Sequence, residues 1–462
     1  MKVFGHHIHP PIVLLAAVEF GAAGLAFAAS AFLIVMMNAP EEAALPTGTL
    51  VFAAIAFSVA VLVGVTSVGL YQAKQRLRIE GVLARILVGL LLAAVLLALI
   101  DFFFPVGLSG PLWGWSFVFS LALLATTRTL CWRWVDNSVF RRNVLVYGAG
   151  TRAASLLKLR RRSDRRGFNI RAFVPAEGDD GVIDDDRVTK LEGSLAAYAR
   201  AQNVDEIVVA VDDRRRGFPI RDLLECKFAG IAVVDLLSFL ERETGKVKVD
   251  LVHPSWLIFA EGFEASARSQ LGSRVLDLVA ATALLVLAAP VMCLCALAIL
   301  LEDGPPVFYR QRRVGYRGRT FTLYKFRSMI KDAEADGAPR WAGTGDSRIT
   351  RVGAVIRKLR LDELPQLLNV FRGDMALVGP RPERPEFVER LSQTIPYYHE
   401  RHAVKPGITG WAQLCYPYGS SVQDAMEKLQ YDLYYIKHKS VIFDLIVLLQ
   451  TAEVVLWGKG AR

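Results

Sequence analysis

Four long apolar stretches dominate the first part of the chain, at about residues 11–37, 49–71, 83–104 and 112–131. Each has close to the ~20 residues that a helix needs to cross the hydrocarbon core of a membrane. The first stretch is too long for a cleaved signal peptide, and further stretches follow it. The pattern therefore predicts a four-helix transmembrane bundle over residues 1–137.

Basic residues follow only some of these stretches, and their placement predicts the orientation of the bundle. The connection between the first two stretches carries Glu41 and Glu42 and no Lys or Arg, and residues 101–111 contain no basic residue either. Basic residues instead follow the second and fourth stretches: Lys74, Arg76, Arg78, Arg85, Arg133, Arg141 and Arg142. Because positive charge stays on the cytoplasmic side, we expect both ends of the bundle to face the cytoplasm.

A fifth apolar stretch, at about residues 278–301, also has the length of a span. If it crossed the membrane, it would export the most basic part of the chain, from Arg310 to Arg327, against the charge rule. Pro290 lies near its middle and would remove a backbone hydrogen bond and kink the helix. We therefore expect a re-entrant helix over residues 274–302 that bends at Pro290 and returns to the cytoplasmic face. A fifth span is the alternative.

Short apolar strands alternate with helical segments between residues 138 and 268, which is typical of a Rossmann-like α/β domain. The first strand, 143–147, runs into Gly148-Ala-Gly150. Later segments continue the alternation: 170–175, 195–202, 206–211, 220–228 and 231–235. No acidic residue ends the second strand to hold a ribose. A regulatory nucleotide site at Gly148 and Gly150, cofactor chemistry and a plain scaffold therefore all stay open.

Composition supports a membrane protein and narrows the class of partner. Apolar residues make up 53% of the 462 residues, which is high for a soluble protein. The formal net charge of +10 allows nucleic acid, anionic lipid or a phosphorylated small substrate. Its densest part follows the fifth apolar stretch, so we expect membrane lipid and a phosphorylated substrate, and no nucleic acid. The five cysteines are scattered and indicate no disulfide scaffold.

Two adjacent carboxylates are the strongest candidates for catalysis. Asp362 and Glu363 precede Pro365 and a Leu-rich segment, which places them in the first turn of a helix, where the dipole favours ionised carboxylates. Neighbours on a helix point about 100° apart. The two groups therefore suit different tasks, one as the nucleophile and the other as the ligand of a divalent metal.

Attack by a carboxylate on a diphosphate requires cations that neutralise the phosphate charge. The candidates for phosphate binding are Arg381, Lys325, Arg327 and Arg360. Arg381 stands between two prolines, which present its guanidinium stiffly for bidentate phosphate contact. The alternative is that Asp362 only caps a helix and the arginines only contact lipid headgroups.

These motifs resemble the bacterial sugar transferase family of polyprenyl-phosphate hexose-1-phosphate transferases, or monotopic phosphoglycosyl transferases. The resemblance covers about residues 272–462 and rests on four segments: Glu302 to Met329, Asp362-Glu363 in DELPQLLNV, Gly379-Pro-Arg-Pro and PGITGWAQ. It implies a multi-domain membrane protein with a four-helix bundle, a Rossmann-like middle domain over 138–268 and an α-rich catalytic domain over 269–462. The whole chain is similar to large members that initiate exopolysaccharide, capsule or O-antigen synthesis.

The resemblance also implies a two-step reaction. Asp362 would attack the sugar-linked phosphate of a UDP-sugar, with glucose or galactose favoured, and release UMP. Undecaprenyl phosphate would then take the sugar phosphate from the enzyme. Glu363 would bind Mg²⁺ and Arg381 the phosphate, at the cytoplasmic face of the bacterial inner membrane, in a multi-pass protein. The bend of such helices is usually Ser-Pro, whereas this chain has Ala289-Pro290. A homodimer through the middle domain is a further hypothesis.

Two other functions compete with this interpretation. A membrane-bound nucleotide-sugar dehydratase or epimerase would need a Tyr-x-x-x-Lys pair in the Rossmann-like domain. That spacing occurs at Tyr435 and Lys439, far from the glycine turn. A noncatalytic membrane regulator that senses nucleotide through the middle domain would not need Asp362, Glu363 and Arg381 together.

Overall fold

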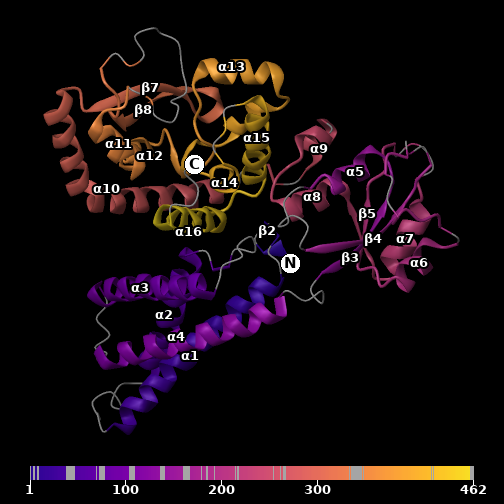
Figure 1. Ribbon diagram of the computed structural model, residues 1–462, viewed down its shortest axis with the longest axis horizontal. Helices are drawn as coiled ribbons and strands as arrows, with labels where there is room; N and C mark the ends of the chain where they lie inside the picture. Colours follow the sequence, from indigo (N-terminus) through magenta and orange to yellow (C-terminus); the bar gives the residue numbers. More distant parts are fainter. Residues whose placement is uncertain are drawn as a thin grey trace. The chain divides into compact units, whose positions relative to one another are not determined.

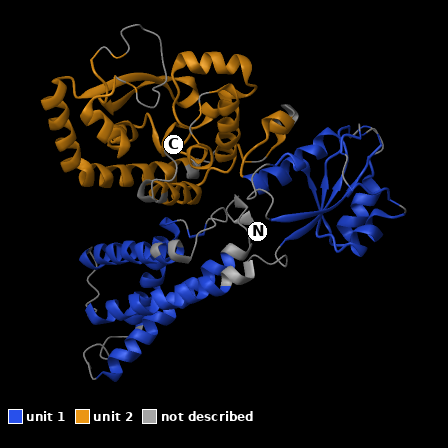
Figure 2. Cartoon of the chain, in the orientation of Figure 1, with its two compact units in different colours: residues 1–244 blue, residues 245–462 orange. Residues whose placement is uncertain are grey.

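The computed structural model divides the chain into two compact units, residues 1–244 and 245–462 (Figures 1 and 2). It describes all residues except 1, 4–5, 8–9, 38–46, 69, 72–78, 104–109, 136–140, 160–166, 178, 180, 184–185, 192, 214, 216–217, 253, 261, 264–266, 332, 334–345, 347, 418, 420 and 458–462. The first unit holds the helical bundle and the α/β domain, and the second holds the catalytic candidates.

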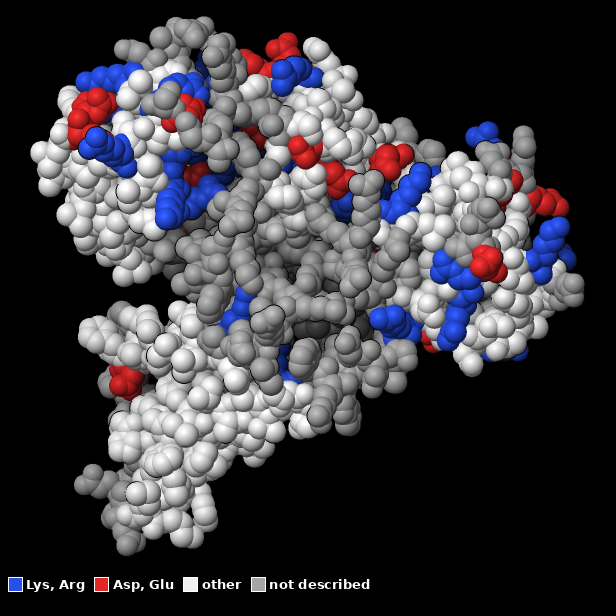
Figure 3. Space-filling view, in the orientation of Figure 1, with Lys and Arg blue, Asp and Glu red and all other residues white. Residues whose placement is uncertain are grey.

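The predicted bundle is present as four long helices. They are α1 (Pro10–Met36), α2 (Thr47–Ser67), α3 (Ile79–Phe103) and α4 (Gly110–Val135), preceded by the short strands β1 (Lys2–Val3) and β2 (His6–His7). Their shared core includes Phe27, Phe57 and Ile86. On the face shown in Figure 3 the bundle carries few charged side chains. Apolar side chains thus cover both the inside and the outside of this bundle, as in a membrane-embedded one.

Small residues let α2 and α3 approach closely. A Cβ on Gly64 would lie 2.1 Å from the carbonyl oxygen of Gly89, which only glycine at this position avoids. Charge inside the bundle is paired: Arg128 of α4 donates to the Glu19 carboxylate of α1 at 2.9 Å, and Tyr71 donates to Glu19 as well. Both features are typical of helix packing in lipid, where close backbone contact and paired polar groups hold helices together.

Four helical segments in the described residues are long and apolar enough to cross a membrane: Val13–Met36, Gly48–Ser67, Arg85–Phe102 and Gln270–Asp303. The predicted fourth span, α4, is not among them, because Trp, Ser and Thr side chains and Arg128 make it less apolar. Most of the residues that predict the orientation lie outside the described part of the chain, among them Glu41, Glu42, Lys74, Arg76 and Arg78. The orientation therefore stays a prediction.

The middle domain is a parallel four-stranded sheet, as predicted. Its strands are β3 (Arg142–Tyr147), β4 (Phe168–Val174), β5 (Glu206–Val209) and β6 (Ala232–Asp235), in the order β4-β3-β5-β6. The connecting helices are α5 (Thr151–Leu157), α6 (Leu195–Ala201), α7 (Ile220–Phe228) and α8 (Leu236–Thr244). All pairings are parallel, and the strands are almost wholly apolar because helices cover both faces of such a sheet.

The second unit packs helices around two small sheets. Its longest helix is α10 (Ala267–Asp303), and its sheets are the antiparallel β7 (Phe308–Val314) with β8 (Thr320–Phe326) and the parallel β9 (Ala376–Val378) with β10 (Gly407–Thr409). The other helices are α9 (Pro254–Phe259), α11 (Arg351–Lys358), α12 (Gln366–Arg372), α13 (Pro385–Thr394), α14 (Trp411–Cys415), α15 (Val422–Lys437) and α16 (Val441–Trp457). Leu367, Leu377 and Leu433 lie in their common core.

Helix α10 begins seven residues before the predicted segment 274–302 and carries Pro290 inside it. Figure 1 shows α10 bent along its length. Many of its apolar side chains are exposed, among them Val279, Leu287 and Leu294. A helix with such a surface needs an apolar surrounding.

The second compact unit begins at Gly245, whereas the predicted catalytic domain begins at residue 269. Trp411 donates from Nε1 to the carbonyl oxygen of Gly245 at 2.8 Å, and the Val247 N–H donates to Gln430 at 3.0 Å. Val247 and Val249 are buried in the catalytic core. The segment that follows residue 244 therefore packs with the second unit, and the domain boundary at residue 268 stays a prediction.

Candidate functional site

Asp362 and Glu363 lie in a single 3₁₀ turn, Leu361–Glu363, that connects α11 to α12. The sequence placed them in the first turn of the helix itself, whereas α12 begins only at Gln366. The preceding Arg360 has the left-handed backbone conformation (φ 60°), which separates helix α11 from this turn. The turn presents two neighbouring carboxylates in different surroundings.

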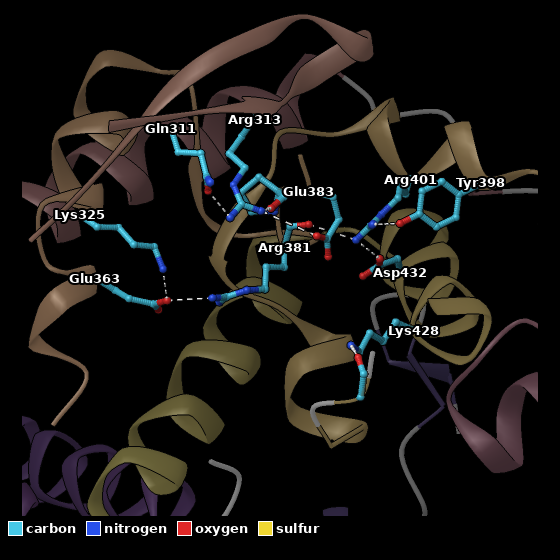
Figure 4. Close-up of polar contacts among 12 residues, drawn as sticks. Gln311, Arg313, Lys325, Glu363, Arg381, Glu383, Tyr398, Arg401, Lys428 and Asp432 are labelled. Carbon is cyan, nitrogen blue, oxygen red and sulfur yellow. Dashed lines mark hydrogen bonds and ion pairs between the residues drawn. The ribbon is translucent and has the colours of Figure 1, made fainter. Parts of the chain in front are cut away.

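Glu363 is held between two cations. Its Oε1 accepts from Lys325 Nζ at 2.7 Å and from Arg381 Nη2 at 2.9 Å (Figure 4). Burial alone would raise the pKa of Glu363, but the Arg381 and Lys325 charges and hydrogen bonds hold it well below its usual range. Glu363 is therefore ionised, and it joins two segments that are far apart in the sequence.

Asp362 has the opposite shift. Burial raises the pKa of the Asp362 carboxyl above its usual value, with a further rise from the Glu363 charge, while Lys325 opposes both. This direction differs from the sequence expectation, in which the helix dipole alone kept both carboxylates ionised. The reason is desolvation, which disfavours the charged form of any carboxyl.

Lys325 reaches Glu363 because α12 fixes strand β8. The buried Asn369 donates from Nδ2 to the Thr322 carbonyl oxygen at 2.7 Å and accepts from the Tyr324 N–H at 3.2 Å. Burial lowers the pKa of Lys325, although the Glu363 charge opposes this. A short hydrogen-bonded connection thus sets the distance between the hairpin and the carboxylate turn.

Arg381 follows a close approach of two backbone segments, the ends of the parallel strands β9 and β10, that only glycine permits. A Cβ on Gly379 would lie 2.3 Å from the Lys405 carbonyl oxygen, and one on Gly410 would lie 2.2 Å from that of Gly379. A Cβ on Gly407 would lie 2.1 Å from the Gly379 nitrogen. Two prolines then flank Arg381 and restrict its backbone. The close approach of the segments at the ends of β9 and β10 therefore determines where Arg381 lies.

The other two predicted phosphate-binding arginines lie outside this group. Arg327 donates from Nη2 to the carbonyl oxygens of Asp303 and Gly304, at 3.1 and 2.6 Å, at the C-terminal end of α10. Arg360 is exposed beside the carboxylate turn. The structure thus brings Asp362, Glu363, Lys325 and Arg381 together, and gives Arg327 the role of a helix cap.

Several residues near Arg381 were not predicted as site residues. Arg313 of β7 donates to the Pro382 carbonyl oxygen at 2.9 Å, and Arg401 donates to that of Arg381 at 3.1 Å. Arg401 also pairs with Asp432. The sequence offered no local signal for these contacts, because each partner is at least 20 residues away along the chain.

The Tyr435 and Lys439 spacing has no catalytic geometry. Tyr435 is fully buried; its hydroxyl donates to the Asp444 carboxylate at 2.7 Å and lies 3.0 Å from the Val378 carbonyl oxygen. Burial raises the pKa of Tyr435 well above its usual value. A phenol held in this way fixes α15 to β9 and α16 and does not serve as the acid or base of a dehydratase.

The chain's own carboxylates fill the glycine turn of the middle domain. Asp212 accepts from the Thr151 and Arg152 N–H groups at 2.7 Å each, and Asp179 accepts from the Ala149 N–H at 2.7 Å. In a dinucleotide-binding turn such N–H groups bind phosphate. A nucleotide phosphate at Gly148 and Gly150 would have to displace both carboxylates.

Comparisons with known proteins agree with this organisation. The model of the family described as bacterial sugar transferase matches residues 268–458, and that of a CoA-binding domain matches residues 66–216. A UDP-N-acetylgalactosamine-undecaprenyl-phosphate N-acetylgalactosaminephosphotransferase from Aeromonas hydrophila is 43% identical over 251 residues, which cover 54% of this chain and 58% of that protein.

Two further relatives align over more of the chain. An undecaprenyl-phosphate glucose phosphotransferase from Komagataeibacter xylinus is 32% identical over 69% of this chain and 60% of that protein. A UDP-glucose:undecaprenyl-phosphate glucose-1-phosphate transferase from Escherichia coli K12 is 33% identical over 69% of this chain and 68% of that protein. The alignments thus span less than two thirds of the Aeromonas and Komagataeibacter proteins. On these matches, the chain belongs to the bacterial sugar transferase family.

Proposed function

We propose that the chain transfers a hexose-1-phosphate from a UDP-sugar to undecaprenyl phosphate and releases UMP. One observation carries this proposal: of two adjacent carboxylates, Glu363 is paired with two cations, while no hydrogen bond or ion pair to the Asp362 carboxylate is found among the described residues. An unpaired carboxylate beside a cluster of cations is suited to attack a phosphate. The relatives are named for the same class of reaction.

In the first step, an Asp362 oxygen attacks the phosphorus that carries the sugar. The bond from that phosphorus to the bridging oxygen breaks, and UMP leaves with the oxygen and its electron pair. A phosphosugar remains on Asp362. In the second step, an oxygen of undecaprenyl phosphate attacks the same phosphorus, the bond to Asp362 breaks, and the product is the sugar linked to undecaprenyl diphosphate.

Arg381 and Lys325 are placed to neutralise the diphosphate in both steps. Each contacts Glu363 beside the nucleophile, and guanidinium and ammonium groups stabilise the charge that gathers on transferring phosphoryl oxygens. The raised pKa of Asp362 also makes this carboxylate a better nucleophile than an ordinary one once it is deprotonated.

Glu363 is where Mg²⁺ would bind. The described residues contain no group of three or more His, Cys, Asp or Glu side chains that could hold a metal alone. This donor set suits Mg²⁺, which commonly takes one or two carboxylates together with substrate phosphates and water. The ion would neutralise phosphate charge, and Glu363 would have to exchange part of its contact with Lys325 or Arg381.

We further propose that α10 is re-entrant and holds the site at the cytoplasmic face of the inner membrane of a bacterium. Its apolar surface and the internal Pro290 support this placement. The basic hairpin β7–β8, which follows α10 directly, supports the cytoplasmic side. In this arrangement the lipid carrier reaches Asp362 from within the bilayer and the UDP-sugar reaches it from the cytoplasm.

The experiment that tests this function is UMP release by the purified protein from UDP-glucose, UDP-galactose and UDP-N-acetylgalactosamine. The relatives differ in their sugars, and glucose or galactose is the prediction here. Release that depends on undecaprenyl phosphate and Mg²⁺ with one donor supports the proposal and names the sugar. No release from any UDP-sugar contradicts it.

The substitution Asp362→Asn tests the nucleophile. It should lower transfer on the order of a thousandfold or more while leaving membrane insertion and the thermal unfolding midpoint close to those of the wild type. Mass spectrometry of the wild type with donor alone should detect the phosphosugar adduct on the peptide that carries Asp362. Full activity of the variant in a clean membrane preparation would contradict the assignment.

A further inference from the structure

A buried ion pair lies behind Arg381, outside the group that faces Glu363. Arg401 Nη2 lies 2.9 Å from Asp432 Oδ2, and the two side chains are 6% and 2% exposed. Arg401 Nη1 also donates to Tyr398 Oη at 2.6 Å. With so little exposed surface, Arg401 has no access to a substrate, so the pair acts only through its neighbours.

Arg401 reaches the backbone of the phosphate-binding segment. Its Nη2 also donates to the Arg381 carbonyl oxygen at 3.1 Å. Figure 4 shows Arg401 on the side of Arg381 opposite Glu363. The next carbonyl oxygen, that of Pro382, accepts from Arg313 at 2.9 Å. Two guanidinium groups thus hold consecutive carbonyl oxygens and fix the peptide from which the Arg381 side chain extends.

A guanidinium can hold two acceptors at once only if both lie in its fixed donor geometry. Asp432, on α15, is the second acceptor of Arg401 Nη2 and so determines where that nitrogen points. Burial of the pair costs desolvation, and such pairs are weak contributors to stability. The place of this pair behind Arg381 is better explained by the orientation that it imposes.

We propose that Arg401, oriented by Asp432, is a positioning residue that fixes Arg381 for binding the diphosphate of the substrate. The proposal rests on the proposed function for its substrate, but the geometry requires only that Arg381 binds a diphosphate. Loss of either member of the pair should therefore weaken diphosphate binding through Arg381, and should have no further effect once Arg381 is absent.

The test is a double-mutant cycle with inorganic pyrophosphate as the probe, measured by calorimetry on the full-length protein. Arg401→Lys and Asp432→Asn should each weaken pyrophosphate binding about tenfold in the presence of Arg381. In the Arg381→Ala background the same substitutions should change the affinity less than about twofold. Tyr398→Phe, which removes one contact of Arg401 and keeps the ion pair, should give a smaller loss.

Glu427→Gln is the matched control. Glu427 lies on the same helix, α15, and forms another ion pair, with Lys246 at 2.6 Å. It should leave pyrophosphate binding unchanged. Thermal unfolding midpoints identify variants that do not fold, and Asp432→Asn and Tyr398→Phe keep the test decisive if Arg401→Lys is one of them.

Three results would overturn the proposal: equal losses with and without Arg381, no loss in either background, or no binding of pyrophosphate by the wild type. The proposed function fails separately. If the wild type binds pyrophosphate and the cycle shows coupling, but no UDP-sugar yields UMP, the positioning role stands and the transfer reaction does not.

Discussion

At the scale of residues, Asp362 and Glu363 are adjacent in the chain but electrostatically different. Lys325 and Arg381 bind Glu363 and lower its pKa, whereas burial raises that of Asp362. Pairs of titratable groups with opposite shifts commonly divide the work of a site between them. Here one carboxyl remains charged at all ordinary pH values and the other titrates at a higher pH than a free aspartate.

This difference predicts the pH dependence of the proposed transfer. Asp362 must be deprotonated to attack, so a raised pKa means that activity falls on acidification at a higher pH than for an ordinary aspartate. Lys325 lowers the pKa of Asp362. Lys325→Met should therefore move the acidic limb of the pH profile of kcat/KM to higher pH. Lys331→Met, which removes an exposed lysine outside the site, should leave the limb in place. A limb that moves to lower pH in Lys325→Met would contradict this assignment.

The sequence predicted four site residues that lie in dense local motifs and that the structure brings together: Asp362, Glu363, Lys325 and Arg381. Arg327 lies apart from these four residues, because strand β8 ends at Phe326 and the following residue turns to the end of α10. The contacts of Arg401 are set by tertiary structure alone, so no spacing rule could reveal them.

At the scale of elements, the middle domain has a fold that is associated with nucleotides but a turn that holds carboxylates. Strand and helix positions were predicted closely, since alternating apolar runs determine them. The carboxylates that occupy the glycine turn were not predicted, because Asp212 lies 61 residues beyond Thr151 in the sequence. A glycine motif describes backbone shape, and several acceptors can satisfy the N–H groups that it exposes.

We expect Asp212→Ala to destabilise the middle domain by about 1–3 kcal/mol, because two N–H groups lose their acceptor. Chemical denaturation followed by fluorescence measures the change. Asp222→Ala, at an exposed position of α7, is the matched control and should change stability by less than about 0.5 kcal/mol. Millimolar CoA or NAD should not raise the melting temperature of the wild type, and a clear rise would show that a nucleotide displaces the carboxylates.

The contact between α2 and α3 gives a second prediction at this scale. Gly64→Ala would place a methyl group 2.1 Å from the Gly89 carbonyl oxygen and should destabilise the bundle by about 1–3 kcal/mol. Gly114→Ala in α4 meets nothing within 4 Å and should be neutral or slightly stabilising. Thermal unfolding in detergent micelles compares the two, and equal midpoints would rule out close packing at Gly64.

At the scale of the whole molecule, the second unit has its own core and its own long apolar helix, α10. Residues 245–462 form one compact unit, and α10 is among the helices apolar enough to cross a membrane. The bundle therefore is not required to hold this unit at a membrane. The fifth apolar stretch, at about residues 278–301, predicts this second apolar segment, separate from the four stretches of the bundle.

A shortened chain of residues 245–462 should therefore remain with the membrane fraction after a carbonate wash. The charged substitution Leu287→Glu, on the exposed surface of α10, should reduce this retention, because a carboxylate in hydrocarbon is costly. Immunoblotting of the soluble and membrane fractions measures both. Complete release of the shortened chain would mean that the bundle is the only anchor.

The close backbone approach at the glycines near Arg381 affects how tolerance to mutation should be interpreted in this protein. A Cβ built on Gly379, Gly407 or Gly410 would lie only 2.1–2.3 Å from a neighbouring backbone atom. In a saturation mutagenesis screen scored by the proposed UMP release, these three positions should accept as few substitutions as Asp362. Low tolerance to substitution alone would then wrongly assign these glycines a chemical role. A position that excludes side chains for lack of space would be recognised by its tolerating only the smallest residues.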